Sequence, residues 1–107
     1  MHWSYLAMAI VCEVAGSTSM KLSAGLKNLV PTLLIFVFYG GAFAFNALAM
    51  RKLDLSVSYA IWAGAGTALT ALIGFTYFRE SVTPLRLASL GLIVLGVLGL
   101  RLSASEP

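Results

Sequence analysis

The sequence predicts an all-α membrane protein with four transmembrane helices. Its 107 residues are 60% hydrophobic and only 10% charged, whereas about a quarter of the residues of a soluble domain are charged. The apolar stretches between its short polar segments approach the roughly 20 residues that a helix needs to cross a bilayer. Lipid offers the backbone no hydrogen-bond partners and the stretches do not alternate as barrel strands do, so the spans are expected to be helices.

Charged residues bound the four predicted spans. The spans cover about residues 3–21, 31–50, 55–78 and 85–102 of a single domain, 1–107. The first ends at Lys21, the second and third contain no charge, and Arg86 and Arg101 are expected to reach the membrane surfaces from the ends of the fourth. The first stretch is expected to stay in the membrane, because it lacks the basic start of a signal peptide and Glu13 interrupts it.

The connections between the spans carry turn and capping residues. Gly25 lies in the first connection, Asp54 and Ser56 are candidate caps of the third helix, and Thr83 with Pro84 starts the fourth. All connections are short, so helices that follow one another are expected to be antiparallel.

Several classes of function are excluded or disfavoured by what the chain lacks. Cys12 and His2 each stand alone, so neither a disulfide nor a metal site is expected. The net charge of +3 comes from basic residues scattered at segment ends, which does not predict a nucleic-acid partner. No nucleophile–base pair and no phosphate-binding loop is present. We therefore expect neither an enzyme nor a bound cofactor.

The distribution of basic residues leaves the orientation in the membrane open. One side of the predicted topology carries Arg51, Lys52 and Arg101, and the other carries Lys21, Lys27, Arg79 and Arg86. Lys and Arg in short loops normally set orientation, and these two groups nearly balance. Either weaker signals select one orientation or the chain inserts both ways.

An oligomer is expected because four short helices cannot enclose a polar pathway and a ligand. Ser89 and Gly96 are seven residues apart on the fourth helix, and Gly99 lies on a neighbouring face. Small residues at such spacing let helices approach closely in a membrane. The same residues could instead serve packing within one chain.

Glu13 is the one formal charge in the interior of a predicted span. A charge at the bilayer centre costs about 2.5 kcal/mol or more, so such residues usually face a functional cavity or a buried partner. No basic residue lies at its depth. Desolvation favours the neutral form of a carboxyl group, and a second carboxylate nearby favours it further. We therefore expect Glu13 to exchange protons for a cation, as one of a pair in an oligomer.

Small, hydroxylated and aromatic residues are expected to surround Glu13. On the first helix, those that share its face or border it are Tyr5, Ala9, Gly16 and Ser17. Tyr39 and Phe43 on the second helix, and Tyr59 and Trp62 on the third, are candidate cation–π partners. Gly64 and Gly66 weaken the third helix and predict a bend. Such a bend would suit an element that alternates between two packings.

These residues resemble the small multidrug resistance family over essentially the whole chain. The similarity is most specific in the segment from Glu13 to Ser23, and in Tyr59-Ala60-Ile61-Trp62 with the two glycines that follow. The resemblance implies an antiparallel, dual-topology dimer in a bacterial inner membrane that exports cationic small molecules in exchange for protons. It implies that Glu13 binds both proton and substrate, that Tyr39, Phe43, Tyr59 and Trp62 line the pocket, and that Ser89 and Gly96 lie in the dimerising stretch.

A few positions distinguish between exporters of different cations within this family. Guanidinium exporters of this family typically carry a tryptophan where this chain has Gly16, so the resemblance favours export of quaternary ammonium and hydrophobic cations. Asn46 places an amide where it could reach the pocket, and Ala42 replaces a frequent serine. The segment 54–60 also resembles spermidine exporters that work as heterodimers, whereas the balanced charge favours a homodimer. A guanidinium exporter, a polyamine-exporting heterodimer subunit and a non-transporting membrane scaffold remain alternatives.

Overall fold

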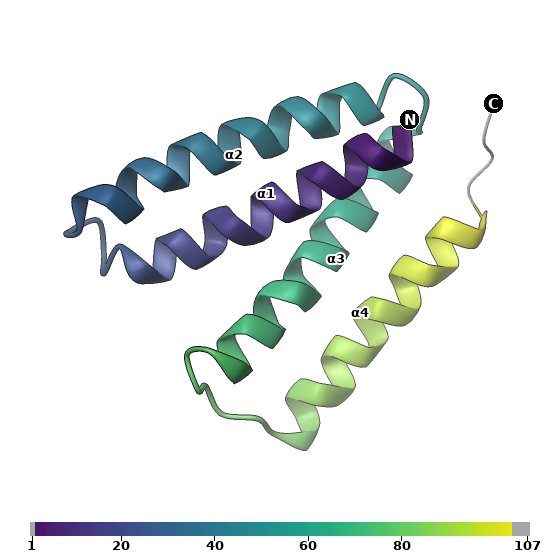
Figure 1. Cartoon of the computed structure of the whole chain (residues 1–107). Helices are drawn as coiled ribbons and strands as arrows, with labels where there is room; N and C mark the ends of the chain where they lie inside the picture. Colours follow the sequence, from purple (N-terminus) through teal and green to yellow (C-terminus); the bar gives the residue numbers. More distant parts are fainter. Residues whose placement is uncertain (1, 104–107) are drawn as a thin grey trace.

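Four helices make up the part of the chain that the structure describes, residues 2–103 of a computed structural model (Figure 1). They are α1 (His2–Leu22), α2 (Leu29–Ala49), α3 (Leu55–Thr76) and α4 (Pro84–Ser103). Nothing in these residues forms a β-strand. The predicted all-α fold is confirmed.

Three of these helices, α2, α3 and α4, are long and apolar enough to cross a membrane. Helix α1 is equally long, with 21 residues. It is less apolar because it contains Glu13 and the hydroxyl run of Ser17, Thr18 and Ser19. These polar residues therefore reduce the hydropathy of α1.

The helices pack unevenly. Helix α1 packs against both α2 and α3, while α4 lies mainly along α3 (Figure 1). The buried core consists of small and apolar side chains from the first three helices and the α2–α3 connection: Leu6, Ala9, Ala42, Ala49, Leu53, Ile61 and Trp62. Helix α4 has no buried residue among those described. Any cavity formed by several helices is thus expected around α1.

The connection between α1 and α2 is a tight left-handed turn. Ala24, Gly25 and Leu26 all have positive φ, with values of 51°, 71° and 73°. Ser23 is buried, donates its hydroxyl proton to the Met20 carbonyl at 2.7 Å and accepts the Leu26 N–H at 3.3 Å. This turn returns the chain so that α2 runs antiparallel to α1.

Two details at helix ends differ from the sequence prediction. The predicted third span reached residue 78, but α3 ends at Thr76, because Arg79 takes a positive φ of 55° and the Glu80 N–H bonds back to the Gly74 carbonyl at 2.9 Å. Asp54 occupies the N-cap position of α3, yet its side chain makes no capping hydrogen bond. Thr83, by contrast, caps α4 by accepting the Arg86 N–H at 3.1 Å.

Candidate functional site

Glu13 lies midway along α1, in a short hydrogen-bonded chain. Its Oε1 accepts the Ser17 hydroxyl at 3.1 Å, and Ser17 Oγ lies 2.7 Å from the Tyr39 hydroxyl. Because Ser17 donates to Glu13, Tyr39 acts as the donor to Ser17. The other carboxylate oxygen, Oε2, is buried and has no hydrogen-bond partner in the described chain. One oxygen is therefore held in place by Ser17, and the other is buried without a hydrogen-bond partner in the described chain.

Gly66 on α3 lies directly against this second oxygen. A Cβ atom built at Gly66 would collide with Glu13 Oε2 and its carboxyl carbon. The absence of a side chain at position 66 is what lets the carboxylate occupy the space between α1 and α3. The sequence prediction assigned Gly66 to a bend and missed this contact.

A groove of about 270 Å³ opens beside Glu13, between α1, α2 and α3. The lining residues are Glu13, Tyr39, Phe43, Tyr59, Trp62, Ala63 and Thr67. The structure thus brings together five residues that the sequence singled out. Ala63 and Thr67 were missed, although they follow Tyr59 at intervals of four along the same face of α3.

Aromatic rings form most of the wall of this groove. Trp62 meets Phe43 and Tyr59 edge-on, with centroid distances of 5.7 and 5.4 Å, and Tyr39 lies 6.3 Å from Phe43. Trp62 is only 7% exposed, whereas Phe43 and Tyr59 are 60% and 55% exposed. Trp62 is therefore fixed by packing, while the two exposed rings border the open side. Aromatic faces beside a carboxylate suit an organic cation.

Three other residues on α1 that the sequence placed near Glu13 do not line the groove. Tyr5 stacks on Phe45 with a centroid distance of 6.4 Å, about two turns before Glu13. Ala9 is fully buried in the core. Gly16 is buried against Tyr39, where a Cβ would approach the ring to 3.0 Å. Gly16 therefore packs closely against the ring that completes the Glu13 hydrogen-bond chain, and a side chain there would require this ring to shift.

Asn46 ties two helices together and does not line the groove. Its Oδ1 accepts the Ser58 hydroxyl at 2.8 Å, linking α2 to α3. Asn46 is 4% exposed and Ser58 is fully buried. Ala42, also fully buried, belongs to the same core and not to the Glu13 hydrogen-bond chain. The amide thus serves packing of the helices that carry the aromatic wall.

Replacing Ser58 with Ala is expected to lower the free energy of unfolding by about 1–3 kcal/mol, because the buried Asn46 oxygen loses its donor. Denaturant titration in detergent micelles, followed by circular dichroism, measures this. Ser56→Ala removes an exposed hydroxyl two residues away and should change stability little. Equal stability of the two variants would contradict a structural role for this hydrogen bond.

The remaining predicted residues concern α4. A Cβ at Gly64 would come within 2.6 Å of Val97, so Gly64 allows α4 to approach α3 closely. Ser89 and Gly96 are both exposed, but Ser89 lines an open cavity between α3 and α4. Nothing lies within 4 Å of a Cβ built at Gly96, so the structure leaves α4 uncovered at Gly96.

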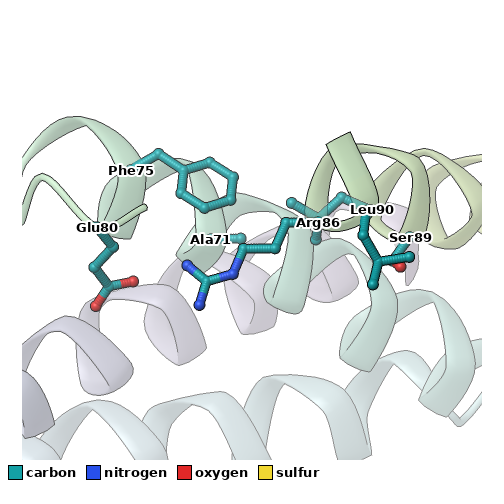
Figure 2. Close-up of a pocket in the computed structure, with 7 residues that line it drawn as sticks. Ala71, Phe75, Glu80, Arg86, Ser89 and Leu90 are labelled. Carbon is teal, nitrogen blue, oxygen red and sulfur yellow. The ribbon is translucent and has the colours of Figure 1, made fainter. Parts of the chain in front are cut away.

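A larger cavity, of about 460 Å³, lies between the end of α3 and the start of α4. Figure 2 shows the Arg86 side chain extending toward Glu80, with the Phe75 ring above its guanidinium. Both charges have local partners, since Glu80 lies 4.0 Å from Lys21 and Arg86 donates to the Ser81 carbonyl at 2.6 Å. This cavity does not include Glu13, and we do not assign the site to it. Within residues 2–103, no cluster of His, Cys, Asp or Glu could hold a metal ion.

Together, the apolar helices and the acidic, aromatic groove define a small helical membrane protein with a site suited to cations. The family model described as Small Multidrug Resistance protein matches residues 1–93. The chain therefore belongs to the small multidrug resistance family, whose members are membrane transporters and not enzymes.

Similar proteins carry related descriptions. The multidrug resistance protein EbrB of Bacillus subtilis is 43% identical, over 95% of this chain and 87% of its own length. The quaternary ammonium compound-resistance protein QacG of Staphylococcus sp. is 40% identical, over 91% of each chain. The guanidinium exporter of Escherichia coli is 38% identical, over 96% of this chain and 98% of its own. These relatives include both subtypes that the sequence left open.

Proposed function

We propose that this protein is a proton-coupled antiporter that exports hydrophobic and quaternary ammonium cations across the bacterial inner membrane. The observation that carries the proposal is the groove in which Glu13 shares the walls with four aromatic rings, while its Oε2 has no hydrogen-bond partner in the described chain. A carboxylate can neutralise one positive charge at a time, so a proton and a cation compete for it.

The lining of the groove supports an organic cation over a small, strongly hydrated one. Four of its seven lining residues are aromatic, and Thr67 and Glu13 are the only two with non-aromatic polar side chains. Quaternary ammonium groups donate no hydrogen bonds and bind well to aromatic faces. Guanidinium would need several acceptors, because it presents N–H donors in a fixed plane. Gly16, packed against Tyr39, agrees with the same subtype.

Guanidinium is the second candidate, favoured by the similarity to the guanidinium exporter of E. coli. Transport of polyamines by a heterodimer has no specific support in the groove, since Glu13 is the one acidic residue that lines it within the described chain. A non-transporting scaffold would leave the Glu13, Ser17 and Tyr39 hydrogen-bond chain without a purpose.

The transport cycle follows from competition at Glu13. A substrate that enters from the cytoplasm displaces the proton from the carboxyl group, and the protein then turns the groove to the other side. A proton from outside releases the substrate and returns the protein. Ser17 stabilises the ionised carboxylate by donating a hydrogen bond to it, and Tyr39 in turn bonds to Ser17.

An antiparallel homodimer, with all four helices of each copy crossing the membrane, would complete the site. In one chain the groove is open, as the exposure of Phe43 and Tyr59 indicates. Helix α4 packs mainly along α3, and its exposed residues include Ser89, Gly96 and Gly99. Small residues on an uncovered helix face permit a second copy to approach closely. Two Glu13 residues would then share one cavity.

A substrate panel in proteoliposomes tests the proposal. Under an imposed pH gradient, we expect tetraphenylphosphonium and a benzyl-substituted quaternary ammonium to be taken up at least about tenfold faster than guanidinium or spermidine, as expected when a desolvated cation–π contact is lost. Preferred uptake of guanidinium would overturn the subtype. Absence of uptake and of binding for all four cations would support the scaffold alternative.

A further inference from the structure

We propose that a basic pocket at the start of α1 and the end of α2 binds the phosphate of an anionic phospholipid headgroup. The basic pocket consists of His2, Tyr5, Leu48, Arg51 and Lys52, and its volume is about 250 Å³. It is separate from the Glu13 groove, with which it shares no lining residue.

The charges of this pocket favour an anion. Arg51 and Lys52 are exposed, and neither forms an ion pair within residues 2–103. Asp54, the acidic residue of the same connection, is also exposed and pairs with neither of them. Two adjacent cations without a counterion attract a phosphate, and a guanidinium can bind it through two parallel hydrogen bonds. An organic cation would be repelled here.

The position of the pocket favours a lipid over a soluble anion. Helix α2 ends at Ala49, so Arg51 and Lys52 come directly after an apolar helix, where a membrane surface would lie. Leu48 and the Tyr5 ring supply the deeper, apolar part of the same pocket. A glycerophospholipid has this same order of groups, with a phosphate above and apolar acyl chains below the glycerol esters.

The pocket is also held in shape. Tyr5 stacks on Phe45 of α2 with a centroid distance of 6.4 Å, which fixes its ring between the two helices. Basic pockets between transmembrane helices are known to bind anionic headgroups.

Lipid binding to the purified, full-length protein tests this site. Native mass spectrometry would compare a phosphatidylglycerol with a phosphatidylcholine of the same acyl chains. We expect the wild type to prefer the anionic lipid, and the double variant R51Q/K52Q to weaken its binding by about fivefold per charge removed, roughly 25-fold in total. The double variant K27Q/R79Q removes the same charge from the opposite end and should change binding by less than about twofold.

Further measurements distinguish a specific lipid site from general electrostatic attraction and from binding of a soluble anion. The charge-conserving variant R51K/K52R should retain most of the binding, and circular dichroism should show equal helix content in all variants. Equal losses in R51Q/K52Q and K27Q/R79Q would overturn the proposal, because the attraction would then be general. Displacement of the lipid by millimolar inorganic phosphate would also overturn it, because the pocket would then take a soluble anion. Failure of this site would leave cation transport at Glu13 unaffected.

Discussion

Replacing Glu13 with Gln is expected to reduce cation uptake driven by a pH gradient to the level of empty liposomes. Gln keeps the size of the side chain and can still accept from Ser17, which bonds to Oε1 in the native protein. It cannot carry a charge or release a proton. Both half-reactions of the exchange therefore fail together, because the substrate loses its counterion and the proton loses its acceptor.

Measurements of cation binding at different pH values test the role of Glu13 more directly than uptake does. In the wild type, binding of a quaternary ammonium cation should strengthen as the pH rises, because protons compete for the same carboxylate. In Glu13→Gln, affinity should fall about a hundredfold or more, the loss expected when a buried charge loses its partner, and its pH dependence should vanish. Glu13→Asp draws the carboxylate back toward α1 and should keep binding with a displaced pH profile.

Glu80→Gln provides the matched control. Glu80 is the carboxylate beside the large α3–α4 cavity, paired with Lys21 and half exposed. Its neutralisation removes the same charge from the protein without touching the groove, so uptake should stay near the wild-type level. Retained transport in Glu13→Gln, or an equal loss in both variants, would refute the assignment of proton and substrate binding to Glu13.

The sequence predicted the four helices and most of the groove. The reason is that an acidic residue in an apolar span, and aromatic residues inside helices, are visible without knowledge of the packing. Glu13, Tyr39, Phe43, Tyr59 and Trp62 indeed meet in one place. Residues four apart on a helix differ by about 40° in direction, so two residues eight apart no longer point to the same side of the helix. Tyr5 lies eight residues before Glu13 and turns to Phe45.

What the sequence could not supply is which helices meet at a given point. Asn46 was a candidate for the pocket because an amide in an apolar helix needs a partner, and the partner proved to be Ser58. Gly64 and Gly66 looked alike as helix-weakening residues. The packing separates them, because Gly64 faces Val97 of α4 while Gly66 faces the Glu13 carboxylate.

Gly66→Ala is accordingly expected to impair cation binding without unfolding the protein. The added methyl group would occupy the space of Glu13 Oε2. A carboxylate at the end of a flexible side chain yields more easily than two packed helices, so Glu13 should rotate away and lose its hydrogen bond from Ser17. Overpacking of this kind costs about 1–3 kcal/mol, which corresponds to binding weakened roughly 5- to 150-fold.

Gly40→Ala is the matched control for this substitution, since nothing lies within 4 Å of a Cβ built at Gly40 in the middle of α2. Both variants make the same chemical change in a helix, and alanine favours a helix over glycine by about 1 kcal/mol. Any general effect of that preference should appear equally in both. A lower affinity and an altered pH profile confined to Gly66→Ala would show that the gap at position 66 sets the Glu13 carboxylate. Wild-type affinity in Gly66→Ala would instead mean that Oε2 has room to move while substrate is bound. The contact between Gly66 and Glu13 would then not affect cation binding.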